Sequence, residues 1–92
     1  LDKGKKIAQS LGCTACHSID GSTSLGPTWK GINGRSGTMS DGTTLVVDDA
    51  YLRESIVNPA AKIVKGYPPL MQPYSLDDDQ LDALVEYIKS AP

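Results

Sequence analysis

The feature that most constrains this chain is the run Cys13-Thr14-Ala15-Cys16-His17, which holds both cysteines and the only histidine of the 92 residues. On a helical turn, cysteines three positions apart point to the same side, so two thiols can reach the two vinyl groups at one edge of a porphyrin. The adjacent histidine can then ligate the iron. The motif therefore predicts one haem c, attached through Cys13 and Cys16, with His17 as a metal ligand.

Three other uses of a C-x-x-C pair fit this chain less well. A zinc site needs four ligands, and the sequence holds no further cysteine and no second histidine. A thioredoxin-like redox pair needs a strand–helix setting, which the flanking sequence lacks. A structural disulfide across so short a loop stabilises a domain little. Haem attachment is the chemistry that uses all three residues.

A second axial ligand has to come from a methionine, because no other histidine exists. Met39 lies near a predicted hairpin, where a methionine packs or faces solvent. Met71 lies in residues 66–75 (GYPPLMQPYS), where three prolines exclude regular helix or central strand. A stiff backbone can hold a weak thioether donor against the iron at little entropic cost. We predict Met71 as the second metal ligand, although any methionine can also serve as a core gap-filler.

Length and composition are those of one small domain, residues 1–92. A chain with no Phe, one Trp and four Tyr has few large side chains to fill an interior, so a cofactor is expected to supply part of the core. The net charge of −2 argues against a nucleic-acid partner. No apolar run approaches the length of a transmembrane segment, and no signal-peptide pattern opens the chain.

Hydrophobic periodicity and end signals predict helices and one hairpin. A helix is expected over 2–11, a short two-stranded ribbon near 38–47 around the Asp41-Gly42 turn signal, and a helix from 48 or 49 to about 57, before Asn58-Pro59. The last helix has the clearest pattern. Ser75 is its expected N-cap, with Asp78 three residues further on. Its apolar stripe consists of Leu81, Leu84, Val85 and Ile88.

Three segments resemble the class I cytochrome c family, and the resemblance covers nearly the whole chain. Residues 4–7 (GKKI) are similar to the N-terminal helix of that family, residues 26–35 (GPTWKGINGR) to the segment after the haem motif, and residues 84–89 (LVEYIK) to the closing helix. The resemblance implies an all-α class I cytochrome c fold. In it the N- and C-terminal helices cross, and three or four short helices surround one haem, here with a short hairpin near 38–47.

The resemblance also implies roles for single residues. The carbonyl of Pro27 is expected to accept the Nδ1 proton of His17 and so fix the tautomer of the imidazole. Arg35 is expected near a haem propionate. Gly4 is expected to meet the closing helix close to Tyr87, which explains a residue of poor helix propensity within a helix.

Two aromatic residues belong to the expected haem environment. Trp29 and Tyr67 can each offer a hydrogen bond to a propionate. For Trp29, plain packing against the haem ring is an equally good interpretation. The predicted cofactor-binding residues are thus Cys13, Cys16, Pro27, Trp29, Arg35 and Tyr67, and the predicted metal ligands are His17 and Met71.

A narrower resemblance involves residues 41–42 (DG), 49–56 (DAYLRESI) and 66–71 (GYPPLM). Together they resemble the haem c domain fused to subunit II of some haem–copper oxidases. This implies one-electron transfer by a His/Met-ligated haem c, from a soluble donor protein to the copper domain of an oxidase. The chain would be an electron carrier rather than an enzyme in itself, within a cytochrome c oxidase complex.

The same resemblance places the domain in a larger context. It implies the C-terminal domain of a longer, membrane-attached subunit, on the periplasmic side or outer face of a bacterial membrane. Two alternatives stay open. The chain can be a stand-alone periplasmic electron carrier, because such cytochromes share parts of the pattern. It can also be a haem enzyme or gas sensor, if a labile distal methionine lets a ligand such as CO reach the iron.

Overall fold

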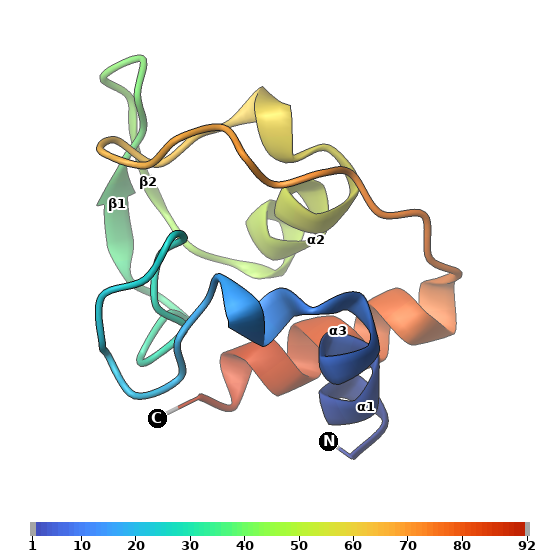
Figure 1. Ribbon diagram of the computed structural model, residues 1–92. Helices are drawn as coiled ribbons and strands as arrows, with labels where there is room; N and C mark the ends of the chain where they lie inside the picture. The colour runs from blue at the N-terminus through green and yellow to red at the C-terminus, as the bar shows by residue number, and fades with distance from the viewer. Residues whose placement is uncertain (1, 92) are drawn as a thin grey trace.

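Within residues 2–91, which the computed structural model describes, three α-helices and one hairpin make up the fold (Figure 1). Helices α1 and α3 lie together at the bottom of Figure 1, α2 lies above α3, and the hairpin stands to one side. In chain order the elements are α1 (Asp2–Leu11), the 3-10 turn η1 (Cys13–Ala15), β1 (Ser36–Thr38), β2 (Thr44–Val46), α2 (Asp49–Val57), the 3-10 turn η2 (Pro59–Ala61) and α3 (Asp78–Lys89). The class I cytochrome c fold expected from the sequence is confirmed.

The close approach of α1 to α3 joins the two ends of the chain. Gly4 is buried, and a Cβ added to it would collide with the carbonyl oxygen of Ala83 and lie 2.7 Å from Cβ of Tyr87. Ala8, one turn further along α1, is fully buried. Small residues on one face of α1 therefore let the backbones of the two helices meet, as expected for Gly4 and Tyr87.

The start of α3 differs from the expectation. Its N-cap is Asp77 rather than Ser75: an Asp77 carboxylate oxygen accepts a 2.7 Å hydrogen bond from the backbone N–H of Gln80. The Gln80 side chain accepts in return from the backbone N–H of Asp77, at 3.1 Å. Only an N-cap at Asp77 puts a glutamine at the third helical position, so this placement satisfies two backbone donors at once. The expected stripe of Leu81, Leu84, Val85 and Ile88 is buried.

The hairpin begins two residues earlier than expected. Strands β1 and β2 pair antiparallel, with Ser36 opposite Val46 and Thr38 opposite Thr44. Around the Asp41-Gly42 turn, the backbone N–H of Met39 donates to the Thr43 carbonyl at 2.8 Å. Met39 also forms an isolated antiparallel bridge with Val64. Segment 63–65 is thereby tied to the hairpin, which brings residues from two distant parts of the chain together.

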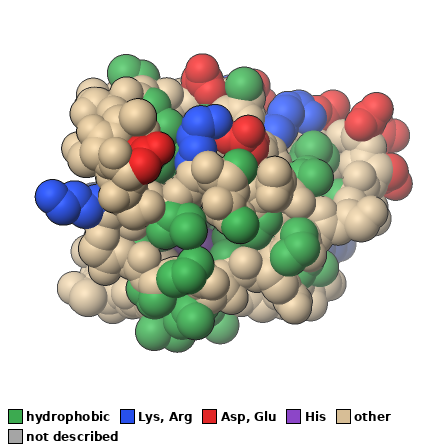
Figure 2. Space-filling view, turned by 90° about the horizontal axis from the view of Figure 1, so that it is seen from above, with side chains coloured by type: hydrophobic (Ala, Val, Ile, Leu, Met, Phe, Trp, Pro, Cys, Tyr) green, Lys and Arg blue, Asp and Glu red, His purple; other side chains and the backbone are tan. Residues whose placement is uncertain are grey.

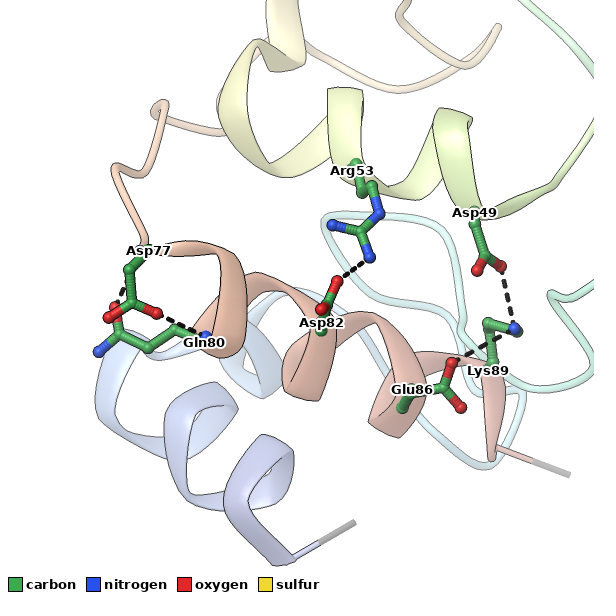
Figure 3. Close-up of polar contacts among 7 residues, drawn as sticks. All are labelled: Asp49, Arg53, Asp77, Gln80, Asp82, Glu86 and Lys89. Atoms are coloured by element: carbon green, nitrogen blue, oxygen red, sulfur yellow. Dashed lines mark hydrogen bonds and ion pairs between the residues drawn. The ribbon is translucent and has the colours of Figure 1, made fainter.

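Helix α2 is held against α3 by packing and by surface ion pairs. Asp48 caps α2 by accepting from the Tyr51 N–H at 2.8 Å, and the helix ends at Val57, as expected. Arg53 pairs with Asp82, and Lys89 Nζ lies 2.9 Å from an Asp49 carboxylate oxygen (Figure 3). These pairs are largely exposed and contribute little to stability. The buried cluster does more, and its members are Ala8, Trp29, Ile32, Val47, Leu52, Ile56, Leu81, Leu84, Val85 and Ile88.

Candidate haem site

A cavity of about 440 Å³ opens above the helical core, and most of its lining is apolar. Figure 2 looks into it from above: hydrophobic side chains surround a hollow in which the only histidine is visible, while most of the charged side chains lie above the hollow in this view. The predicted site residues all line this one cavity. They are Cys13, Cys16, His17, Pro27, Trp29, Arg35, Tyr67 and Met71.

The C-x-x-C-H motif forms a tight turn directly after α1. Gly12 takes a left-handed conformation with φ of 74°, which ends α1 and starts η1. The backbone N–H groups of Cys16 and His17 both donate to the Cys13 carbonyl, at 3.2 and 3.0 Å. This turn presents both cysteine side chains to the same cavity. Burial raises the pKa of the Cys13 thiol.

The imidazole of His17 is oriented by the loop that follows the motif. Its Nδ1 lies 2.8 Å from the carbonyl oxygen of Pro27. A carbonyl can only accept, so Nδ1 carries the proton and Nε2 keeps a free lone pair. Burial lowers the pKa of His17, and the bond to Pro27 offsets part of that effect. A Cβ on Gly26 would lie 2.7 Å from Cε1 of the imidazole, so only glycine fits beside the ring.

Both methionines line the cavity, in different settings. Met71 lies in the segment between η2 and α3, whose residues 66–77 contain no helix or strand and which is orange in Figure 1. Met71 is 36% exposed. Met39 is 2% exposed and anchored by backbone pairing to Thr43 and Val64. Of the two settings expected for Met39, packing and exposure to solvent, the structure shows packing. Its place in this cavity was not predicted from sequence.

Arg35 and Tyr67 lie at the cavity without a contact that defines their role there. Arg35 donates from Nη2 to the Thr28 carbonyl at 2.8 Å and from Nη1 to the Lys30 carbonyl at 3.3 Å, so its guanidinium braces the loop after the motif. Tyr67 is half-buried. Their placement near a propionate stays a prediction.

The sequence model of the cytochrome c family matches residues 1–92. The chain belongs to the cytochrome c family. Among curated proteins, it is 33% identical over 90 residues to the cbb3-type cytochrome c oxidase subunit CcoP of Helicobacter pylori, and 32% identical over 90 residues to the CcoP subunit of Helicobacter pylori strain 52. Each alignment covers 98% of this chain but 27% of the relative, so the chain spans about a quarter of the length of these proteins.

The cavity of this cytochrome c domain fits the haem c that the family implies. The described residues supply two thiols, an imidazole with an available Nε2 and a thioether around one largely apolar cavity. Within residues 2–91, no three His, Cys, Asp or Glu side chains gather as an alternative metal site. No helix in the same range is long and apolar enough to cross a membrane.

One contact in this cytochrome c domain was not foreseen. The Trp29 indole stacks on the His17 imidazole, with ring centroids 5.2 Å apart and an interplanar angle of 15°. The sequence-based interpretations placed Trp29 at a propionate or against the haem ring. The only sequence signal for the observed contact is that Trp29 follows the expected imidazole partner, Pro27, by two residues.

Proposed function

We propose that this domain carries single electrons through a haem c bound covalently by Cys13 and Cys16, with His17 and Met71 as the iron ligands. The observation that carries the proposal is the arrival of both thiols, Nε2 of His17 and the Met71 side chain at one apolar cavity. When bound, the haem supplies reversible exchange of one electron between Fe(II) and Fe(III).

The chain's own residues account for a carrier rather than a catalyst. The Pro27 carbonyl accepts a hydrogen bond from Nδ1–H of His17, so the imidazole keeps one tautomer and one orientation. A neutral thioether from Met71 favours the ferrous state and raises the potential. With His17 and Met71 both bound to the iron, no position would remain for a small substrate. The apolar lining would also raise the potential, because it disfavours the additional positive charge of Fe(III).

We further propose that the electrons go to a terminal oxidase. The relatives are named as oxidase subunits, and residues 49–56 and 66–71 resemble the haem c domain fused to subunit II of haem–copper oxidases. On this proposal a soluble protein is the donor and the oxidase copper domain the acceptor. The domain then works on the periplasmic side of a bacterial membrane, as part of a longer subunit.

Spectroscopy tests the proposal. The protein is produced in a host that matures c-type haem, and its alkaline pyridine spectrum, its ferric spectrum and the CO response of the reduced form are recorded. We expect a covalent haem c, a methionine–iron charge-transfer band and no CO binding. A protein without covalent haem would overturn the proposal. Ready CO binding would favour the gas sensor or haem enzyme instead.

The oxidase step has its own test. The reduced domain is mixed either with a purified cbb3-type oxidase or with a purified oxidase that has a copper domain in subunit II. Its reoxidation in air is followed optically. We expect oxidase-dependent reoxidation that CO or cyanide on the oxidase abolishes. Reoxidation no faster than autoxidation with either oxidase would contradict a terminal oxidase as acceptor, while leaving the electron-carrier assignment intact.

A further inference from the structure

The His17 imidazole is enclosed on three sides by residues of one short loop. The Pro27 carbonyl binds Nδ1 at 2.8 Å, and Gly26 lies so close that a Cβ there would press on the ring. The third side is the face of Trp29, parallel to the imidazole within 15°. The hydrogen bond fixes the position of the Nδ1 edge of the imidazole, and the indole fixes the orientation of the imidazole plane.

We propose that Trp29 is a positioning residue that holds the plane of the His17 imidazole and lowers the reduction potential of the iron ligated by it. The inference rests on the proposed function, because it assigns an effect on the bound haem. It differs from both sequence-based interpretations of Trp29, since the contact partner is the ligand and not the porphyrin.

Trp29 is itself held rigidly, as a positioning residue must be. It is 5% exposed, and its backbone N–H donates to the Ser18 carbonyl at 2.8 Å. The Tyr87 ring meets it edge-on, with centroids 6.2 Å apart and planes at 89°. Tyr87 lies on α3, where Gly4 lets α1 approach. Trp29 therefore connects the imidazole to the site where the terminal helices α1 and α3 pack together.

The effect on the potential follows from the charge of an aromatic face. The π face of an indole is negative and attracts a cation, more strongly so where water is excluded. A ligated imidazole carries more positive charge on Fe(III) than on Fe(II). Stacking at 5.2 Å in a buried position thus stabilises the oxidised form more than the reduced form. Removing the π face while keeping the site dry should raise the potential.

The experiment compares Trp29→Phe, Trp29→Leu and the wild-type holoprotein. Reduced-to-oxidised ratios are measured at one fixed ambient potential, and haem methyl resonances are recorded in the ferric state. We expect a ratio about threefold higher in Trp29→Leu, a smaller rise in Trp29→Phe, and altered spacing of the methyl resonances that is larger for Trp29→Leu. Such spacing reports the orientation of the imidazole plane.

Val85→Ala is the matched control for lost stability, because Val85 is 1% exposed in the core but does not line the cavity. It should lower the unfolding midpoint without moving the ratio or the resonances. If Trp29→Leu likewise lowers only the midpoint, Trp29 is merely structural and the inference is wrong. A fall in the ratio would also overturn it. A wild-type protein without haem c in its pyridine spectrum would instead refute the proposed function itself.

Discussion

At the scale of single residues, Met71 and Met39 are two thioethers at one cavity with different surroundings. Met39 pairs through its backbone with Thr43 and Val64 and is almost fully buried, so its side chain fills core volume. Met71 lies in a segment free of helix and strand and keeps a third of its surface exposed. Tyr74, whose N–H donates to the Ile56 carbonyl at 3.0 Å, ties that segment to α2. Met71 is therefore placed on a tethered loop, as a ligand to an added group requires.

Replacing each methionine by leucine separates these roles, because leucine keeps the volume and removes the sulfur. In Met71→Leu we expect the reduced protein to bind CO, the methionine–iron band to disappear and the potential to fall, since a neutral thioether no longer favours the ferrous state. In Met39→Leu we expect none of these changes and less than about 1.5 kcal/mol of destabilisation. CO titration and redox potentiometry measure both variants. Equal effects from the two would show the ligand assignment to be wrong.

The placements that sequence alone can predict are those that depend on a short stretch of chain. Cys13, Cys16 and His17 lie within one turn, so their spacing alone brings them to one side. The stack of Trp29 on His17 joins residues 12 positions apart whose planes depend on the intervening loop. No periodicity encodes such an angle. The hydrogen bond between Pro27 and His17 was predicted from the resemblance to cytochromes c. Residue spacing alone could not have predicted it.

At the scale of elements, the α1–α3 crossing depends on Gly4. In Gly4→Ala the new methyl group would meet the Ala83 carbonyl and Cβ of Tyr87, so the helices must separate. We expect a loss of about 1–3 kcal/mol, although alanine favours an isolated helix by about 1 kcal/mol. Urea unfolding of the holoprotein measures the loss. Ser10→Ala, at an exposed position of α1, should change stability by less than about 0.5 kcal/mol. A stable Gly4→Ala protein would contradict the packing argument.

The hairpin turn should weaken in acid. The Thr43 hydroxyl and N–H both donate to the Asp41 carboxylate, which lowers the pKa of Asp41 below its ordinary 3.8. An acid with a depressed folded-state pKa stabilises the fold above its unfolded pKa, and this contribution is lost as the pH falls through the folded value. Below about pH 4, wild-type stability should therefore fall towards that of Asp41→Asn, whose amide does not titrate. The difference between their unfolding midpoints should shrink from pH 5 to pH 2, and a constant difference would refute the coupling.

Element boundaries show where sequence reasoning stops. Helix α2 was predicted to within a residue because an aspartate cap and Asn58-Pro59 mark its ends. The start of α3 was misplaced because Ser75 and Asp77 are both acceptable caps, and only the reciprocal bond to Gln80 decides between them. The pairing of Met39 with Val64 joins segments 25 residues apart, and no local signal predicts it.

At the scale of the whole molecule, the core is built around a volume that the side chains do not fill. The chain has no Phe, and its buried cluster lies beneath a cavity of about 440 Å³ with a mostly apolar lining. Apolar volume that side chains leave unfilled destabilises a fold, so a large group bound in this cavity would contribute to the core. Because the chain has few large side chains, we expect its folding to depend on the covalent attachment of a large ring.

Removing the attachment should consequently unfold the domain. In the double variant Cys13→Ser, Cys16→Ser we expect loss of covalent haem, reduced helical circular dichroism and no cooperative unfolding transition, because the remaining side chains cannot close over the cavity. The single variant Cys13→Ser keeps one thiol for attachment and should retain a cooperative transition at a lower midpoint. Far-ultraviolet circular dichroism during urea titration distinguishes these states. A double variant that unfolds cooperatively at the wild-type midpoint would mean that the helices pack stably by themselves, with α1, α2 and α3 sufficient for the fold and the haem only a guest within it.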